Sequence, residues 1–178
     1  MPEINDAYKT ISKPTEGEFR DRGSKFIAYA FEVKDEEEIK ERLEEVKSIH
    51  PKARHYCYAY QLGLDDDRYR ANDDGEPNGS AGLPILNTIK SFEITNALIV
   101  VVRYFGGTLL GVSGLINAYK SAAIEALSTA KIIGKTVNKL IHIRFEYPQM
   151  NDIMQFVKTH DITIKEQTYD TKSGLILD

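Results

Sequence analysis

The most restrictive feature of the sequence is an uninterrupted apolar run, ALIVVV, at residues 97–102. It is far shorter than the roughly 18 residues that span a bilayer, and most of its residues are β-branched. Such a run predicts a central strand covered on both faces, because a half-solvated strand would alternate apolar and polar residues. The glycines in the following segment, RYFGGTLLGVSG, indicate either a tight turn that serves packing or a backbone that approaches a ligand.

The segments around this strand predict a mixture of strands and helices. One helix has its N-cap at Asp35, with Glu38 at the capping-box position, and ends before Pro51. Residues 64–82 are rich in Asp, Asn, Gly and Pro without apolar periodicity, which predicts one long loop. The other expected elements are a hairpin within 16–33 that turns near 21–24, strands at 53–62 and 96–105, and helices at 84–92 and 115–131.

The sequence changes character after Gly134 and predicts a second, smaller domain. Residues 139–148 predict a strand, 151–160 a helix, 162–170 a strand and 173–178 the start of another strand. This β-α-β-β order is the first part of a ferredoxin-like domain, which needs a further helix and strand. We therefore expect domains at 1–134 and 135–178, with the second one truncated.

Composition narrows the class of protein. The chain has 178 residues, a formal net charge of −4 and a single cysteine, Cys57, so no intramolecular disulfide can form. The start, MPEINDAYKT, lacks the basic flank and apolar segment of a signal peptide, which predicts a cytoplasmic protein without a membrane span. Binding to nucleic-acid phosphates requires clustered Lys and Arg, whereas the net charge of this chain is negative. Any contact with RNA must therefore be confined to a small part of the surface.

The glycine-rich turn does not match the known phosphate loops. Gly106 and Gly111 have P-loop spacing, but Val112 stands where the phosphate-binding lysine belongs. The spacing also excludes a dinucleotide fingerprint. Two interpretations stay open: the glycines serve packing, or Arg103 and the amides of Gly106 and Gly107 bind an anion.

The acidic loop and the tyrosines each allow a structural and a functional interpretation. Asp65–Asp67, followed by Asp73, Asp74 and Glu76, could chelate a cation, although the spacing excludes an EF-hand, or Asp73 or Asp74 could pair with Arg103. His55 could act as a general base beside Cys57, but no nucleophile elbow is present. The tyrosines at 56, 58 and 60, with Arg54 on the same strand face, could stack bases or form packed core.

Three blocks, ARHYCYAY, NDDGEPNGSAGLPIL and VVRYFGGTLLGVSGLINAY, closely resemble the YigZ/IMPACT family over residues 15 to 130. The resemblance implies an α+β fold: an N-terminal domain like domain IV of elongation factor G, of the ribosomal-protein domain-2-like type, and a ferredoxin-like C-terminal domain. It also implies relatives that regulate translation, and it transfers no catalytic residues. Ser113 and Asn117 depart from the glycine and arginine that are common in relatives.

We therefore predict a non-catalytic cytoplasmic protein that binds RNA, the ribosome or a translation-associated protein, with no cofactor and no metal. The oligomeric state stays open. One alternative is a small-molecule enzyme that uses His55, Asp74, Glu76 and Arg103, and another is a pure protein-protein recruitment module. The predicted binding residues are His55, Asp73, Asp74, Glu76, Arg103, Tyr104, Phe105, Gly106 and Gly107.

Overall fold

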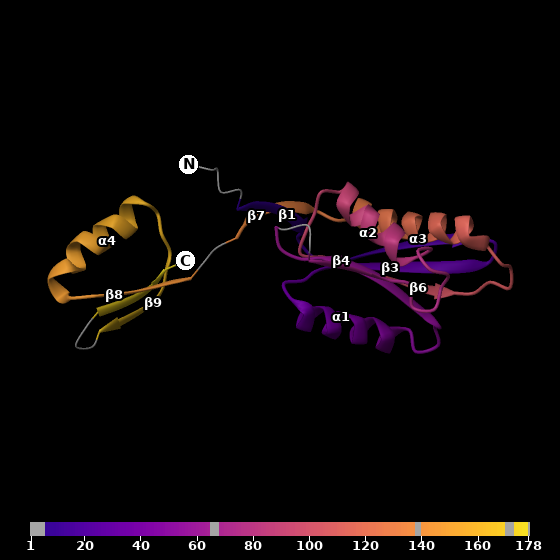
Figure 1. Cartoon of the computed structure of the whole chain (residues 1–178), viewed down its shortest axis with the longest axis horizontal. Helices are drawn as coiled ribbons and strands as arrows, with labels where there is room; N and C mark the ends of the chain where they lie inside the picture. Colours follow the sequence, from indigo (N-terminus) through magenta and orange to yellow (C-terminus); the bar gives the residue numbers. More distant parts are fainter. Residues whose placement is uncertain (1–5, 65–67, 138–139, 170–172, 178) are drawn as a thin grey trace. The chain divides into compact units, whose positions relative to one another are not determined.

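The computed structural model describes residues 6–64, 68–137, 140–169 and 173–177 (Figure 1). The chain divides into two compact units, the larger of which spans Ala7–Lys135. Thr136–Asp178 and the first six residues belong to the smaller unit. The fold is α+β, with a separate small sheet in the C-terminal part of the chain.

The larger unit is built on a five-stranded antiparallel sheet in the order β2-β3-β6-β4-β5. The apolar run forms the middle strand, which confirms the prediction of a central strand. A further small sheet pairs β1 with β7. The bounds are β1 Ala7–Ile11, β2 Thr15–Asp21, β3 Ser24–Glu32, β4 His55–Gln61, β5 Tyr69–Asn72, β6 Ala97–Tyr104 and β7 Ile132–Thr136.

Helices cover both faces of this sheet, as the apolar run requires (Figure 1). Helix α1 (Glu36–Ile49) lies on one face, and α2 (Gly82–Ser91) and α3 (Gly111–Ser128) lie on the other. Alternate residues of β6 pack into two cores: Leu98, Val100 and Val102 on the α1 side, and Ala97, Ile99 and Val101 on the α2–α3 side. Each core takes every second residue, so no polar position occurs before Arg103.

Strand β4 has the two unequal faces that its alternation predicts. Cys57 and Ala59 face α2 and α3, whereas the tyrosines at 56, 58 and 60 pack in the core beside α1. The small side chains let the α2–α3 layer lie close to the sheet. The approach is tightest at Gly17 of β2, where a Cβ would lie 2.2 Å from the backbone nitrogen of Ala126.

Three details differ from the sequence predictions. Residues 64–82 are not one irregular loop, because Tyr69–Asn72 form edge strand β5, which is exposed and therefore carries no apolar periodicity. Helix α3 begins at Gly111 rather than Leu115. Asp35 caps α1 as predicted, but the Glu38 carboxylate accepts the amide of Lys34 and closes no capping box with Asp35.

The smaller unit confirms the predicted β-α-β-β order. Strand β8 (Ile141–Phe145) is followed by a short 3₁₀ helix, η1 (Tyr147–Gln149), and by α4 (Met150–Thr159), β9 (Ile164–Tyr169) and β10 (Ser173–Leu177). The sheet is antiparallel in the order β8-β10-β9, and its core includes Phe145, Val157 and Leu175. Within the described parts of the chain, no helix has the length and apolar character needed to cross a bilayer.

Candidate functional site

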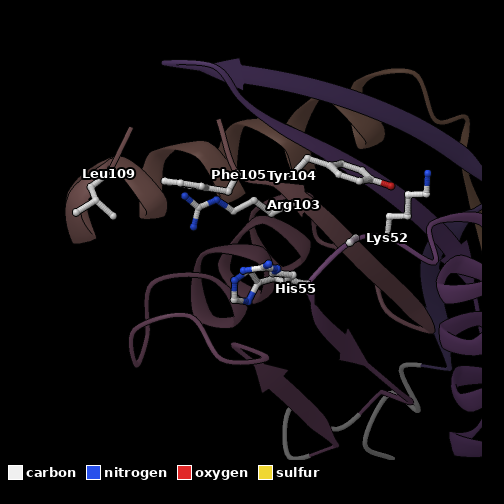
Figure 2. A pocket seen from close by; sticks show the side chains of 8 residues that line it. Lys52, His55, Arg103, Tyr104, Phe105 and Leu109 are labelled. Carbon is white, nitrogen blue, oxygen red and sulfur yellow. The ribbon is translucent and has the colours of Figure 1, made fainter. Parts of the chain in front are cut away.

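A pocket opens where the start of β4 lies beside the end of β6 (Figure 2). The two strands are neighbours in the sheet, and His55 is the register partner of Arg103. The pocket has a volume of about 530 Å³. Its lining residues are Lys52, Ala53, Arg54, His55, Arg103, Tyr104, Phe105 and Leu109.

The lining of this pocket is basic and aromatic. Lys52, Arg54, His55 and Arg103 contribute nitrogen groups, and none of the described residues that line the pocket is acidic. Lys52 and Arg54 are exposed and form no ion pair with the described residues. Arg103 is ion-paired with Glu76, so the cations of this lining without an ion pair among the described residues are Lys52 and Arg54. Unpaired cations around a concave surface attract anions, even on a chain whose net charge is negative.

Arg103 forms a buried part of the lining, with 7% of its side chain exposed. Its guanidinium lies over two aromatic rings, 5.5 Å from the Phe26 centroid and 5.6 Å from the Phe105 centroid. Nη1 donates a 2.6 Å hydrogen bond to Glu76 Oε1, and Nε has no acceptor among the described residues. Contacts with two aromatic rings and an ion pair with a carboxylate restrict the orientation of this guanidinium.

Glu76 connects Arg103 to the core. The same Oε1 accepts a 2.8 Å hydrogen bond from the hydroxyl of Tyr119, whose oxygen lies 3.3 Å from Cys57 Sγ. This network joins the acidic loop to α3, β4 and β6. Burial raises the pKa of the Cys57 thiol and of the Tyr119 hydroxyl, so both groups stay protonated at neutral pH. Cys57 is fully buried and lies outside the pocket.

The two aspartates act as internal hydrogen-bond acceptors. The Asp73 carboxylate caps the start of α2, accepting hydrogen bonds from the backbone amides of Gly79, Ala81 and Gly82. The Asp74 carboxylate accepts the amide of Tyr56 at 2.7 Å, and its backbone carbonyl lies 2.9 Å from His55 Nδ1. Both residues therefore fasten the loop to β4 and α2. Neither aspartate forms an ion pair with Arg103. The acidic residue of this loop that pairs with Arg103 is Glu76.

No metal site emerges from the described residues, since no three His, Cys, Asp or Glu side chains converge there. Asp65–Asp67, part of the chelating interpretation, lie outside the described residues. The tyrosines at 56, 58 and 60 pack beside α1, so they offer no stacking platform.

The glycines of the turn after β6 serve different purposes. The Gly106 amide donates a 3.1 Å hydrogen bond to Ser24 Oγ. It is therefore not free to bind the anion that the sequence analysis assigned to it. A Cβ on Gly106 would lie 1.9 Å from the carbonyl carbon of Gly23, where the β2–β3 turn touches this segment. Gly107 has φ 89° and open space around it. Packing therefore explains Gly106, and the backbone turn explains Gly107.

The structure brings four predicted site residues together: His55, Arg103, Tyr104 and Phe105 line the pocket. The predicted acidic residues are not among the lining: Asp73, exposed Asp74 and Glu76, whose side chain is buried, accept hydrogen bonds from within the protein. The sequence analysis did not predict Lys52 or Leu109 as site residues. It considered Arg54 only as a residue on the same strand face as the tyrosines. The basic run HPKARH immediately before β4 was the signal that could have found the two cations.

Comparison with known proteins identifies the family. The Impact N-terminal domain matches residues 22–127, more than half of the chain. The chain belongs to the IMPACT family. The family member YvyE of Bacillus subtilis is 34% identical over 163 residues, which cover 92% of this chain and 75% of YvyE. YigZ of Escherichia coli is 37% identical over 132 residues, which cover 73% of this chain and 65% of YigZ.

A solved structure shows that this IMPACT-family fold occurs elsewhere. The crystal structure of a hypothetical protein aligns with a TM-score of 0.79 and 31% identity, covering 98% of this chain and 85% of that one. Protein IMPACT of Oryctolagus cuniculus is 36% identical over 97 residues, which cover 51% of this chain and 30% of that protein. The resemblance to the YigZ/IMPACT family is therefore confirmed.

Proposed function

We propose that this IMPACT-family protein is a cytoplasmic, non-catalytic component of translational regulation that binds RNA through the basic pocket. The observation that carries the proposal is the lining itself, in which the exposed cations Lys52 and Arg54 form no ion pair with the described residues and lie beside His55 and Arg103. RNA phosphates are the anions that such a surface meets in the translation apparatus, and phosphate contacts supply most non-specific affinity. The resemblance to the YigZ/IMPACT family also implies relatives that regulate translation.

The proposed fold assignments agree with this role. We assign the larger unit to the type seen in domain IV of elongation factor G, and the smaller unit to the ferredoxin-like type. The β-α-β-β order and the antiparallel sheet of the smaller unit support the second assignment. We also propose domains at 1–134 and 135–178; the change of unit between Lys135 and Thr136 supports this boundary, although the first six residues group with the smaller unit.

The enzymatic alternative has less support from the geometry. It needs Asp74 and Glu76 as free acids or bases, but Asp74 accepts the Tyr56 amide and Glu76 accepts Arg103 and Tyr119. A carboxylate that is already hydrogen-bonded inside the protein is poorly placed to move a substrate proton. These contacts favour a binding role, while catalysis stays an untested prediction.

Charge reversal at the pocket rim tests the proposal. Fluorescence anisotropy with a labelled single-stranded RNA at about 50 mM salt measures affinity where electrostatic contacts are strongest. We expect Lys52→Glu with Arg54→Glu to abolish binding. The matched control, Lys13→Glu with Lys40→Glu, changes the net charge equally at exposed positions outside the pocket and should retain most of the affinity. Failure of the wild-type protein to bind, or equal losses in both variants, would overturn the proposal.

One further observation favours protein recruitment as a second candidate function. A groove of about 470 Å³ lies between α2 and α3, with Leu83 and Ile116 exposed in its lining and Lys120 at its edge. Exposed apolar residues in a groove are typical of protein contacts. Pull-down with and without nuclease separates the two functions: a partner lost with Ile116→Glu but resistant to nuclease supports recruitment, and a nuclease-sensitive partner supports RNA binding.

A further inference from the structure

Phe105 is an exposed aromatic residue at the mouth of the basic pocket. Phe105 is the residue directly after the buried strand β6, yet it is 58% exposed. Its ring lies 5.6 Å from the Arg103 guanidinium, so Arg103 contacts the ring from within the protein. Beside it, Leu109 is 82% exposed. An exposed ring supported by a guanidinium is the arrangement on which unpaired bases stack.

The exposed cations Lys52 and Arg54 come from a different part of the pocket than the aromatic ring. Figure 2 shows Phe105 and Leu109 on one side, Lys52 on the other and His55 below Arg103. Lys52, Arg54 and His55 come from the segment that leads into β4, whereas Phe105 and Leu109 follow β6. A ligand that fits this division has a planar apolar end and an anionic end.

Size and hydrogen bonding limit the ligand further. A volume of about 530 Å³ lies within the range of small-molecule sites, which holds a monomeric unit rather than a double helix. Arg103 Nε has no acceptor among the described residues, although buried donors are almost always satisfied.

We propose that the pocket is a subsite for one unpaired nucleotide, whose base stacks on Phe105 and whose phosphate is bound by Lys52, Arg54 and His55. This inference rests on the RNA-binding function proposed above and adds a specificity to it. Bases inside a duplex are already stacked and cannot reach the ring. The protein therefore selects single-stranded over double-stranded RNA.

A tryptophan in place of Phe105 reports directly on base stacking. The chain contains no tryptophan, so Phe105→Trp introduces a single indole at an exposed position. We expect adenosine and uridine monophosphate to quench its fluorescence, whereas inorganic phosphate and ribose 5-phosphate leave it unchanged. Tyr69→Trp, at an exposed aromatic position on β5, is the matched control and should show no quenching. Absence of quenching by both nucleotides, or equal quenching by ribose 5-phosphate, would overturn the inference.

Affinity measurements separate this inference from the proposed function. Phe105→Leu should weaken single-stranded RNA binding by at least about fivefold, the loss expected for one stacked base, and Phe105→Tyr should retain it. Duplex RNA and poly-glutamate should compete weakly. If Phe105→Leu binds normally and duplex competes as well as single strands, the nucleotide subsite is wrong while RNA binding stands. If poly-glutamate competes as well as RNA, the pocket accepts acidic protein and both proposals fall.

Discussion

Arg103 and Glu76 form a buried ion pair in which each charge depends on the other. Their side chains are 7% and 5% exposed, so water cannot replace a lost partner. We expect Glu76→Gln to lower the free energy of unfolding by about 3–5 kcal/mol, because it leaves a buried guanidinium without its counter-charge. Adding Arg103→Met should restore part of the loss. Urea unfolding of the single and the double variant measures both free energies. A Glu76→Gln variant as stable as the wild type would contradict the prediction.

Gly106 is a residue that packing alone constrains. The Cβ of Gly106→Ala would lie 1.9 Å from the backbone of Gly23, and neither backbone segment can yield cheaply. We expect a loss of about 1–3 kcal/mol or more in unfolding free energy, measured by thermal or urea denaturation. Gly134→Ala is the control, since a Cβ there meets nothing within 4 Å. Equal stability of the two variants would show that the turn accommodates the methyl group.

At the scale of elements, Asp73 fixes where α2 begins. Its carboxylate accepts the backbone amides of Ala81 and Gly82 at the start of that helix and of Gly79 in the preceding loop, and the N-cap residue, Ala81, provides no side-chain cap. Removing a helix-capping side chain typically costs about 0.5–2 kcal/mol. We expect Asp73→Ala to lose at least about 1 kcal/mol and Asp73→Asn to lose less, in urea unfolding. Exposed Lys40→Ala serves as the control, and a neutral Asp73→Ala would exclude the capping role.

How far the sequence predicts an element depends on what the element buries. Strand β6 is fully predictable because both of its faces are apolar. The helix after Asp35 is predictable because its N-cap residue and the helical spacing of its apolar residues agree. Strand β5 is not predictable, since its four residues depend on backbone pairing with β4 and bury little surface.

The candidate site was also predictable only in part. The contact between the acidic loop and Arg103 was predictable, but not that Glu76 makes it, because positive φ values at Asp74 and Gly75 redirect the chain.

At the scale of the whole molecule, burial of Cys57 and Tyr119 makes stability depend on alkaline pH. Burial raises the pKa of the Cys57 thiol above its ordinary 9.0 and the pKa of Tyr119 above 10.0. The unfolded chain loses these protons first, so the stabilisation is complete below about pH 9 and declines as pH rises, by up to about 1.4 kcal/mol per pH unit and group. Urea unfolding between about pH 8 and pH 10 measures the decline.

Cys57→Ala provides the control for this pH dependence. Without the thiol, the decline should begin only near the ordinary pKa of tyrosine, 10.0. Because Cys57 is the single cysteine, a thiol reagent adds a second readout. We expect the folded protein to resist the reagent and the urea-unfolded protein to react with one equivalent. Rapid reaction of the folded protein would contradict the buried, protonated thiol.

The larger unit contains the whole pocket, which allows a test of how function is divided along the chain. All the lining residues lie within Ala7–Lys135, and the pairing of β1 with β7 closes that unit. We expect a chain that ends at Val137, and so retains β7, to fold and to bind single-stranded RNA within about threefold of the full chain, since affinity depends on phosphate contacts in the pocket. Circular dichroism and anisotropy measure both. A folded short chain that binds more than about tenfold more weakly would assign part of the RNA contact to the smaller unit.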